Sequence, residues 1–289
     1  MNPGDYRILD VGAARLAVRS PVASFHAHLD QVYPHLQATA DTQFADARLA
    51  LLPGPRFRFG RREVVLWADG QRPFEAYPYD AGLPLFEWGS NFLLSQRLNA
   101  YLLLHAGVVA RNDRAVILPA APGSGKTTLT CALHLAGWRF LSDEFGVLDM
   151  DRGCLLPMVR PAPLKNQSIS IIRQRPGAVL GPLFPKTRKG DVAHFVPDRA
   201  SFLARHTPAQ PALVVFPRFI AGAALHCQPL SKAETVLRLG QNSFNYLALG
   251  PVGFRAVVAL ARQAPAWEMV YGDLDAAMAQ IDKLLDAVS

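Results

Sequence analysis

The stretch Ala120-Ala121-Pro122-Gly123-Ser124-Gly125-Lys126-Thr127 decides how this 289-residue chain folds. It matches the phosphate-binding loop pattern G-x-x-x-x-G-K-[ST], with alanine in place of the first glycine. The two later glycines allow the backbone N–H groups to form a nest around a phosphate. An apolar run at 115–118 precedes the loop, and Leu129 and Leu133 follow it at helical spacing. The sequence therefore predicts a strand, a phosphate loop and a helix in succession.

The loop predicts a site for a nucleoside triphosphate. Lys126 is expected to reach the β- and γ-phosphates, and the Thr127 hydroxyl is expected to ligate Mg²⁺. The start of the following helix adds the positive end of its dipole. The residues expected to bind the nucleotide here are Pro122, Gly123, Ser124, Gly125, Lys126, Thr127 and Thr128. No N-K-x-D motif for guanine and no S-G-G-Q-like motif of ABC-type ATPases is present in the sequence.

A pair of carboxylates follows the loop closely. Asp143 and Glu144 end the apolar run 138–141, and Asp143 lies 17 residues beyond Lys126. That distance leaves room for one helix of about 11 residues and a direct return to a neighbouring strand. Adjacent side chains on a strand point to opposite faces, so both carboxylates can serve one site only if the strand ends in a turn here. A solvated acidic turn is the alternative.

His105 stands at the start of the predicted strand that leads toward the loop, 21 residues before Lys126. A lone histidine is most often a structural residue. A catalytic role for His105 depends on whether its side chain reaches Asp143.

Positive charge is concentrated in one segment. Residues 152–190 contain eight Lys or Arg and no Asp or Glu, whereas the formal charge of the whole chain is only +7. Three interpretations stay open: a solvated charged surface, a nucleic-acid site, or a cationic lid over the triphosphate and its acceptor. Nucleic-acid sites pair cations with stacking aromatics, and Phe184 is the sole aromatic residue in this segment. We favour the lid and expect no nucleic-acid partner.

In the lid, Arg160 and Lys165 are expected to neutralise charge that develops on the phosphates. The residues expected to meet an acidic or peptidic substrate are Lys186, Arg188 and Lys189.

Taken together, three motifs resemble the bacterial HPr serine kinase/phosphatase superfamily, in particular the HPr-kinase-related proteins called HprK-related kinase A. These motifs are His105-Ala106-Gly107, the phosphate loop and Ser142-Asp143-Glu144. Four further stretches extend the resemblance over most of the chain. They are Phe86-Glu87-Trp88-Gly89, Arg160-Pro161-Ala162-Pro163-Leu164-Lys165-Asn166, Thr187-Arg188-Lys189-Gly190 with Ala193-His194, and Ser243-Phe244-Asn245-Tyr246.

The resemblance implies an α/β fold with a P-loop kinase domain of the HPr kinase and phosphoenolpyruvate carboxykinase type. It also implies ATP and Mg²⁺ as cofactors, and transfer of phosphate to a hydroxyl, usually of a serine. By this likeness Asp143 takes the proton of the acceptor hydroxyl and His105 lies beside it. A metal role is implied for Glu144, together with Thr127 and Asp143.

The chain departs from true HPr kinases in Ala120, in its Asp-Glu pair, and in lacking their Arg-Gly signature. The acceptor therefore stays open among a protein, a peptide and a small molecule. A non-catalytic ATP-binding switch or partner protein in a peptide-modification pathway is the alternative. Since Lys126 and Asp143 are both present, we favour the enzyme. Relatives of the HPr kinases form rings, so a homo-oligomer is a further possibility.

Length and composition predict two parts. At about 150 residues per domain, we expect an N-terminal α+β unit at 1–90, for packing or partner docking, and the P-loop domain at 91–289. Helices are predicted at 21–37, where Ser20-Pro21 supplies an N-cap and a first-turn proline, and at 91–104. The segment 150–200 is expected to be long and irregular because it is rich in Pro, Gly and Arg.

The three cysteines are widely spaced, which predicts neither a disulfide framework nor a zinc site. The first residues lack the pattern of a signal peptide, and no apolar run is long enough to span a bilayer. We therefore expect a cytoplasmic protein with no membrane partner.

Overall fold

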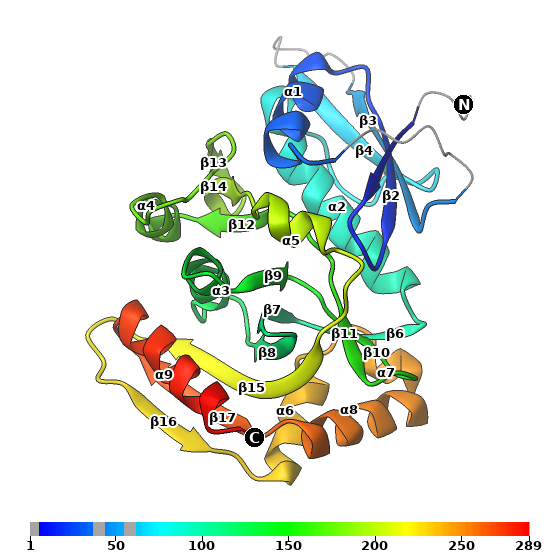
Figure 1. Ribbon diagram of the computed structural model, residues 1–289. Coiled ribbons are helices and arrows are strands. Elements are labelled where there is room, and N and C mark those ends of the chain that lie inside the picture. The colour runs from blue at the N-terminus through cyan, green and yellow to red at the C-terminus, as the bar shows by residue number, and fades with distance from the viewer. Residues whose placement is uncertain (1–5, 37–43, 55–61, 289) are drawn as a thin grey trace.

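The computed structural model describes residues 6–36, 44–54 and 62–288 and shows a mixed α/β protein with several sheets (Figure 1). Gln37, the predicted end of the first helix, and residues 1–5 lie outside the described residues. In the described part, no helix combines the length and the apolar character that a membrane span requires. All three cysteines are free thiols.

A six-stranded sheet forms the centre of the molecule, in the order β16-β17-β15-β8-β7-β9. β15 is parallel to both β8 and β17, whereas β7 is antiparallel to β8 and β9. The ends of β8 and β9 therefore meet the start of β7 at one edge. The strands are β7 (Ala106–Arg111), β8 (Arg114–Pro119), β9 (Arg139–Ser142), β15 (Gln210–Phe219), β16 (His226–Pro229) and β17 (Ala266–Tyr271).

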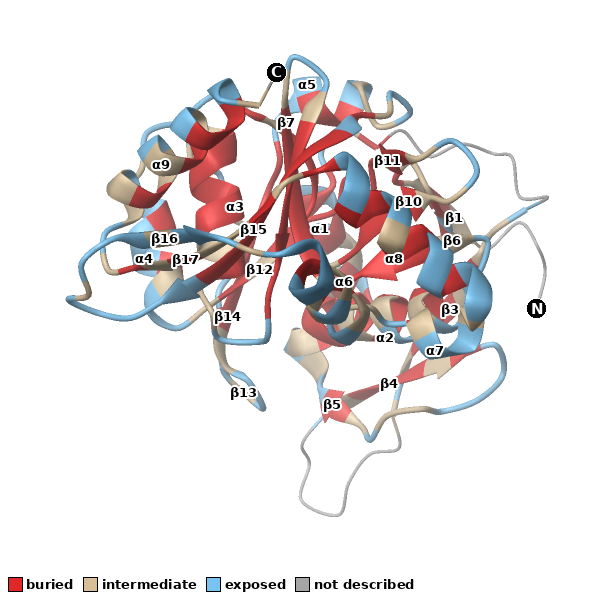
Figure 2. Ribbon diagram, turned by 90° about the horizontal axis from the view of Figure 1, so that it is seen from below, coloured by how far each residue is buried: buried red, intermediate tan, exposed pale blue. Residues whose placement is uncertain are grey.

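Helices cover both faces of this sheet; its strands β15, β8, β7 and β9 are mostly buried, whereas the edge strand β16 is largely exposed (Figure 2). α3 (Lys126–Leu135) and α9 (Leu274–Asp286) share one apolar cluster with the sheet. α6 (Lys232–Gln241) and α8 (Pro251–Gln263) share another, on the opposite face. The short α7 (Tyr246–Leu249) precedes α8. Apolar residues recur at helical spacing in α8 and α9 and form their buried faces.

Close packing places α3 directly against β7. A Cβ atom built on Gly107 would lie 2.0 Å from the Thr130 hydroxyl oxygen of α3. Any larger residue at 107 would push the helix away from the sheet. The glycine in the His-Ala-Gly stretch thus sets how near the helix that begins at Lys126 lies to the strand that follows His105.

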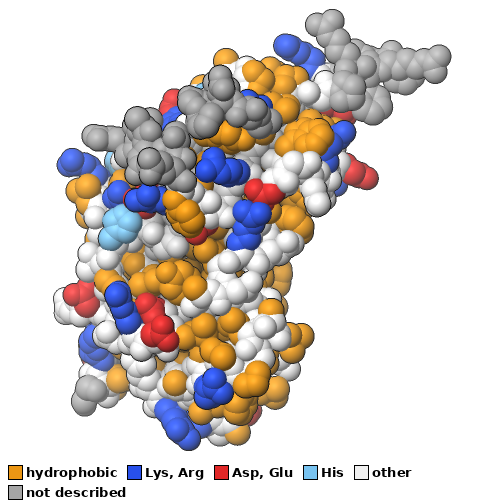
Figure 3. Space-filling model, turned by 90° about the vertical axis from the view of Figure 1, so that its right-hand side faces the viewer, with side chains coloured by type: hydrophobic (Ala, Val, Ile, Leu, Met, Phe, Trp, Pro, Cys, Tyr) orange, Lys and Arg blue, Asp and Glu red, His pale blue; other side chains and the backbone are white. Residues whose placement is uncertain are grey.

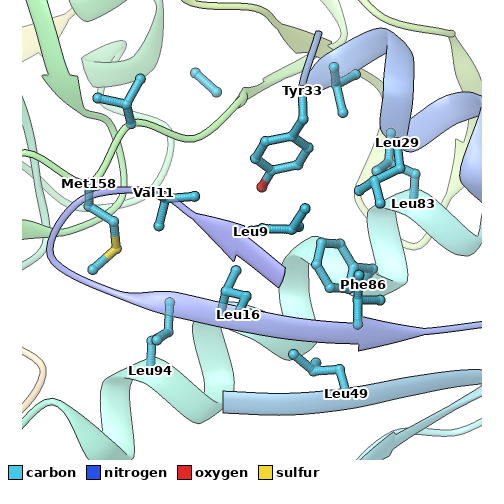
Figure 4. Close-up of a cluster of buried hydrophobic side chains, with 14 of the residues drawn as sticks. Leu9, Val11, Leu16, Leu29, Tyr33, Leu49, Leu83, Phe86, Leu94 and Met158 are labelled. Atoms are coloured by element: carbon cyan, nitrogen blue, oxygen red, sulfur yellow. The ribbon is translucent and has the colours of Figure 1, made fainter. Parts of the chain in front are cut away.

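The N-terminal part is a five-stranded sheet in the order β1-β2-β3-β4-β5, packed against two helices (Figure 1). Its apolar core is shown in Figure 4. The strands are β1 (Arg7–Asp10), β2 (Arg15–Arg19), β3 (Ala47–Pro53), β4 (Glu63–Ala68) and β5 (Tyr77–Pro78), and the helices are α1 (Ala23–Val32) and α2 (Gly82–Arg97). α1 begins two residues later than predicted: the Ser20 hydroxyl accepts the Val22 N–H, and Val22 is the residue before the helix.

The helix predicted at 91–104 is wrong at both ends. α2 begins at Gly82, nine residues earlier, and the apolar run 101–104 is strand β6 (Tyr101–Leu104). β6 pairs with β10 (Gly146–Asp149), which pairs with β11 (Cys154–Leu156). α2 continues through residue 90, where the division between the two parts is predicted.

The segment 150–200 is also more regular than predicted. Besides β11 it contains two helices and a small antiparallel sheet in the order β12-β14-β13. These elements are β12 (Ala162–Lys165), α4 (Gln167–Arg173), β13 (Phe184–Thr187), β14 (Gly190–Phe195) and α5 (Arg199–Leu203). The small sheet shares one apolar core with the N-terminal sheet and with α3 and β9. In Figure 1 it lies between these parts of the molecule.

Candidate functional site

The predicted site residues meet at one edge of the central sheet. The phosphate loop follows β8, the carboxylate pair follows β9, and His105 directly precedes β7. The register places Ala106 opposite Pro119 and Val108 opposite Ser142. The topology thus brings together residues that are up to 39 positions apart in the chain.

The phosphate loop has the backbone shape that its glycines predict. Gly123 and Gly125 both have a φ of +86°, in the left-handed region that favours glycine. The Phe219 N–H at the end of β15 donates to the Ser124 carbonyl at 2.9 Å. A Cβ on Gly125 would lie 2.6 Å from the Tyr271 hydroxyl oxygen at the end of β17. The loop is therefore seated on two parallel strands.

Exposure varies along the loop. Pro122 and Gly123 are exposed and Lys126 is buried; the half-buried residues are Ser124, Gly125, Thr127 and Thr128.

Lys126 and Thr127 both contact Asp143. The Lys126 ammonium donates to the Asp143 backbone carbonyl at 3.0 Å, and the Thr127 hydroxyl donates to Asp143 Oδ2 at 2.8 Å. The first turn of α3 and the end of β9 are thereby joined through two different atoms of one residue.

Asp143 is a buried carboxylate that is only half satisfied. It is 4% exposed, and its Oδ1 atom has no hydrogen-bond partner among the described residues. Burial raises the pKa of Asp143; the charge of Lys126 opposes this, and the charge of Glu144 raises the pKa further. A partner for Oδ1 would therefore have to come from outside the described residues.

Glu144 points to a different partner. β9 ends at Ser142, so neither carboxylate is bound to the alternating faces of a strand, which is the condition that the sequence set for a shared site. His105 Nε2 lies 3.6 Å from Glu144 Oε2, whose side chain is 28% exposed. His105 therefore pairs with Glu144. The role expected for His105 depended instead on a direct contact between its side chain and Asp143.

Glu144 is ionised over the whole neutral range. Burial acts to raise its pKa, but the contact with His105 and the charge of Lys126 together lower the pKa to about 2.

A C-terminal segment completes the surroundings of His105. The His105 N–H donates to the Asn242 carbonyl at 2.6 Å, and the Phe244 ring packs edge-on against His105 with centroids 5.2 Å apart. Phe244 also packs on Phe145, at 4.8 Å between centroids. Sequence reasoning assigned no role to the 243–246 stretch. Its Phe244 ring holds the His105 ring in position.

Arg160 is bound within the protein. Its guanidinium donates to Glu87 Oε2 at 2.6 Å and to Asn91 of α2, and the Tyr33 hydroxyl donates to Glu87 Oε1 at 2.8 Å. Arg160 was expected to neutralise charge on the phosphates, but its guanidinium already has a carboxylate partner in Glu87.

A narrow pocket nevertheless lies beside Arg160, and residues of α2 line it together with the carboxylate pair. Its wall includes Glu87, Trp88, Asn91, Asp143 and Glu144. Sequence reasoning missed these α2 residues as site neighbours, although the Phe86-to-Gly89 stretch carried a signal.

No protein-family model matches the chain, and no curated protein matches it either. The likeness to the HPr kinases thus remains an expectation from the sequence motifs.

The edge offers a cationic nest, a hydroxyl and two carboxylates, which suits a phosphate ester accompanied by a hard divalent cation. The described residues contain no group of three or more His, Cys, Asp or Glu placed to hold a metal ion by themselves. Mg²⁺ usually binds through one or two carboxylates plus substrate phosphates. A metal here would accordingly depend on the nucleotide.

Proposed function

We propose that this protein is an ATP- and Mg²⁺-dependent kinase that transfers the γ-phosphate to a serine-type hydroxyl of a protein, peptide or small molecule. We further propose that its nucleotide domain is of the HPr kinase and phosphoenolpyruvate carboxykinase type. One observation carries the proposal. A phosphate loop and a buried carboxylate with an unpartnered oxygen lie in direct contact at one sheet edge.

The nucleotide would be held by the loop. Backbone N–H groups from Gly123 to Thr128 and the start of α3 favour the anionic phosphates. Lys126 adds a full charge from a buried position. Because the loop is braced by Phe219 and Tyr271, it keeps its shape before the nucleotide binds, which lowers the cost of binding.

The residues present fit Mg²⁺. The Thr127 hydroxyl and Asp143 Oδ2 are hard oxygen ligands 2.8 Å apart, and Asp143 Oδ1 has no partner in the described chain. Thr127 and Asp143 would hold the ion, and Glu144 lies next in the chain. When bound, Mg²⁺ would neutralise charge on the phosphates.

Asp143 is the group that we propose accepts the acceptor's hydroxyl proton. Its raised pKa suits a base better than the low pKa of Glu144. The Glu144 and His105 pair would act beside it as a positioning pair, with His105 held by Phe244. Phosphoryl transfer relies mainly on positioning and charge stabilisation, which such a fixed arrangement supplies.

The deciding experiment incubates the full chain with Mg²⁺, γ-labelled ATP and serine-containing candidate acceptors. We expect a labelled serine with the wild type and none with Asp143→Asn, while both bind a fluorescent ATP analogue. Lys126→Met should lose both binding and transfer. Nucleotide binding without transfer to any acceptor would instead indicate a switch protein, and absence of nucleotide binding would overturn the proposal altogether.

A stability measurement controls for misfolding. Because burial raises the pKa of Asp143, an ionised carboxylate costs the folded state free energy at neutral pH. Asp143→Asn should therefore raise the free energy of unfolding by about 1 kcal/mol. Urea denaturation would show this as a higher midpoint than in the wild type. Asp149→Asn, at the end of β10, provides a matched change away from the loop.

A further inference from the structure

The basic segment 152–190 does not act as one charged surface. Four of its eight cations have carboxylate partners elsewhere in the fold. These pairs are Arg152 with Asp149, Arg160 with Glu87, Arg175 with Asp275 and Arg188 with Glu75. Charge that is neutralised in this way is not available to a ligand. Among the described residues, Lys165, Arg173, Lys186 and Lys189 have no such carboxylate partner.

Lys165 and Lys189 come together at one end of the small sheet. Lys165 ends β12 opposite Val192, and Lys189 stands in the turn just before β14 begins at Gly190. Neither ammonium group has a carboxylate ion pair among the residues that the structure describes. Both lysines also act electrostatically on Glu144.

The turn that carries Lys189 is pinned to the N-terminal unit. The Lys189 ammonium lies 4.8 Å from the Trp88 ring centroid, and the Arg188 N–H donates to the Tyr77 hydroxyl at 3.1 Å. Tyr77 packs edge-on against Trp88 at 5.4 Å. Since Trp88 also lines the narrow pocket beside Asp143 and Glu144, the lysine is held at the edge of the candidate site.

Lys165 and Lys189 lie near enough to repel each other, and Glu144 compensates this repulsion only in part. Partial burial and the charge of Lys165 both lower the pKa of Lys189, and Glu144 opposes this. Glu144 cannot fully neutralise both lysines because it already pairs with His105. An anion from outside the chain would relieve the repulsion.

We propose that Lys165 and Lys189, backed by Trp88, form a subsite for an anionic group, a carboxylate or a phosphate, that the acceptor carries near its reactive hydroxyl. This inference rests on the proposed kinase function and names a property of its acceptor. The nucleotide has its own lysine in the phosphate loop, and Lys189 belongs to an exposed turn fixed on the N-terminal unit. The subsite therefore lies on a part of the chain other than the phosphate loop, at a solvent-exposed turn that an acceptor can reach.

The γ-phosphate of the nucleotide is the other anion that Lys165 and Lys189 could bind. Lysine acetylation distinguishes it from an anionic group on the acceptor. The chain has six lysines, so mass spectrometry follows every one. The full chain is acetylated with a water-soluble ester, alone, with a saturating non-hydrolysable ATP analogue and Mg²⁺, and with this analogue plus inorganic sulfate. We expect sulfate to slow modification of Lys165 and Lys189 at least threefold in the analogue complex, with Lys232 and Lys283 unchanged.

Two variants sharpen the result. Lys189→Gln should abolish the protection of Lys165 by sulfate, whereas Lys186→Gln, the same charge change three residues earlier, should keep it. Protection by the analogue alone, with no addition from sulfate, would assign the lysines to the nucleotide and overturn the inference. Protection by neither would overturn it as well. A failure of the kinase proposal shows separately, as absent binding of a fluorescent ATP analogue or absent transfer.

Discussion

Gly125 is required for two independent reasons, and its neighbour Gly123 for one. Both glycines have the same left-handed φ, but a Cβ on Gly125 would also lie 2.8 Å from Phe219 Cβ, whereas nothing lies within 4 Å of one on Gly123. Gly123→Ala should cost about 1–2 kcal/mol of backbone strain. Gly125→Ala should cost more and displace the loop, weakening binding of a fluorescent ATP analogue at least tenfold relative to Gly123→Ala.

The two variants control each other because they change the same residue type in the same backbone conformation. Equal loss of nucleotide affinity in both would show that the contacts with Phe219 and Tyr271 do not shape the loop. Urea unfolding of both variants separates loss of affinity from loss of fold.

At this scale the sequence predicts which residues meet but not how they pair. The loop pattern and the short spacing to Asp143 are local features, and their contact follows from one helix and one strand. The partner of His105 is different, because adjacent carboxylates can face the same site only where the strand stops. Where β9 stops is set by its pairing with β7, which no short window of residues contains.

Between elements, the Glu87 and Arg160 ion pair joins α2 to the chain that leads into β12. Both side chains are less than one-tenth exposed. Removing one partner of a buried pair leaves an unpaired charge and costs about 3–5 kcal/mol. We therefore expect Glu87→Ala to lower the free energy of unfolding by about that amount, measured by urea denaturation at neutral pH. The Tyr33 hydroxyl would lose its acceptor as well.

Glu75→Ala is the matched control. Glu75 pairs with Arg188, but both side chains are more than half exposed. Exposed pairs contribute about 0–1 kcal/mol, so this variant should remain close to the wild type. A Glu87→Ala effect as small as that of Glu75→Ala would mean that the buried pair does not hold α2 in place.

The elements that sequence reasoning missed share a physical cause. β12 contains Pro163 and β13 contains Pro185, and prolines in a short run indicate a loop. Both strands are edges of the β12-β14-β13 sheet, where a proline is tolerated because its missing N–H leaves no ladder bond unmade. The run 101–104 was misread for another reason: four consecutive apolar residues fit a helix or a buried strand equally well.

Over the whole molecule, the distribution of charge depends on the tertiary structure. The basic segment has no acidic residue of its own, yet its partners come from positions as far apart as 75 and 275. On the face drawn in Figure 3, lysine and arginine side chains are scattered among acidic and apolar ones rather than gathered. The sequence favoured a single cationic lid, whereas the fold pairs four of the eight cations with carboxylates.

His194 makes the stability of the whole fold sensitive to acid. It is fully buried on β14, neither ring nitrogen has a hydrogen-bond partner among the described residues, and it packs near Phe184 in the core that the small sheet shares with the N-terminal unit. Burial lowers its pKa from 6.5 to about 4, with Glu87 opposing and Arg160 adding to the shift. The folded protein therefore keeps this ring neutral where an unfolded chain would protonate it.

Between pH 6.5 and 4 the unfolded chain binds more protons, so the free energy of unfolding falls as the pH falls through this range. The loss should reach on the order of 3 kcal/mol at the acidic end. His194→Phe removes the titrating group, so urea denaturation at several pH values should show a shallower decline than in the wild type. His226→Phe, at an exposed position, should leave the decline unchanged. If the free energy of unfolding declined equally with falling pH in wild type and His194→Phe, the assignment would be contradicted. Replacing the titrating ring must remove its contribution to the pH dependence.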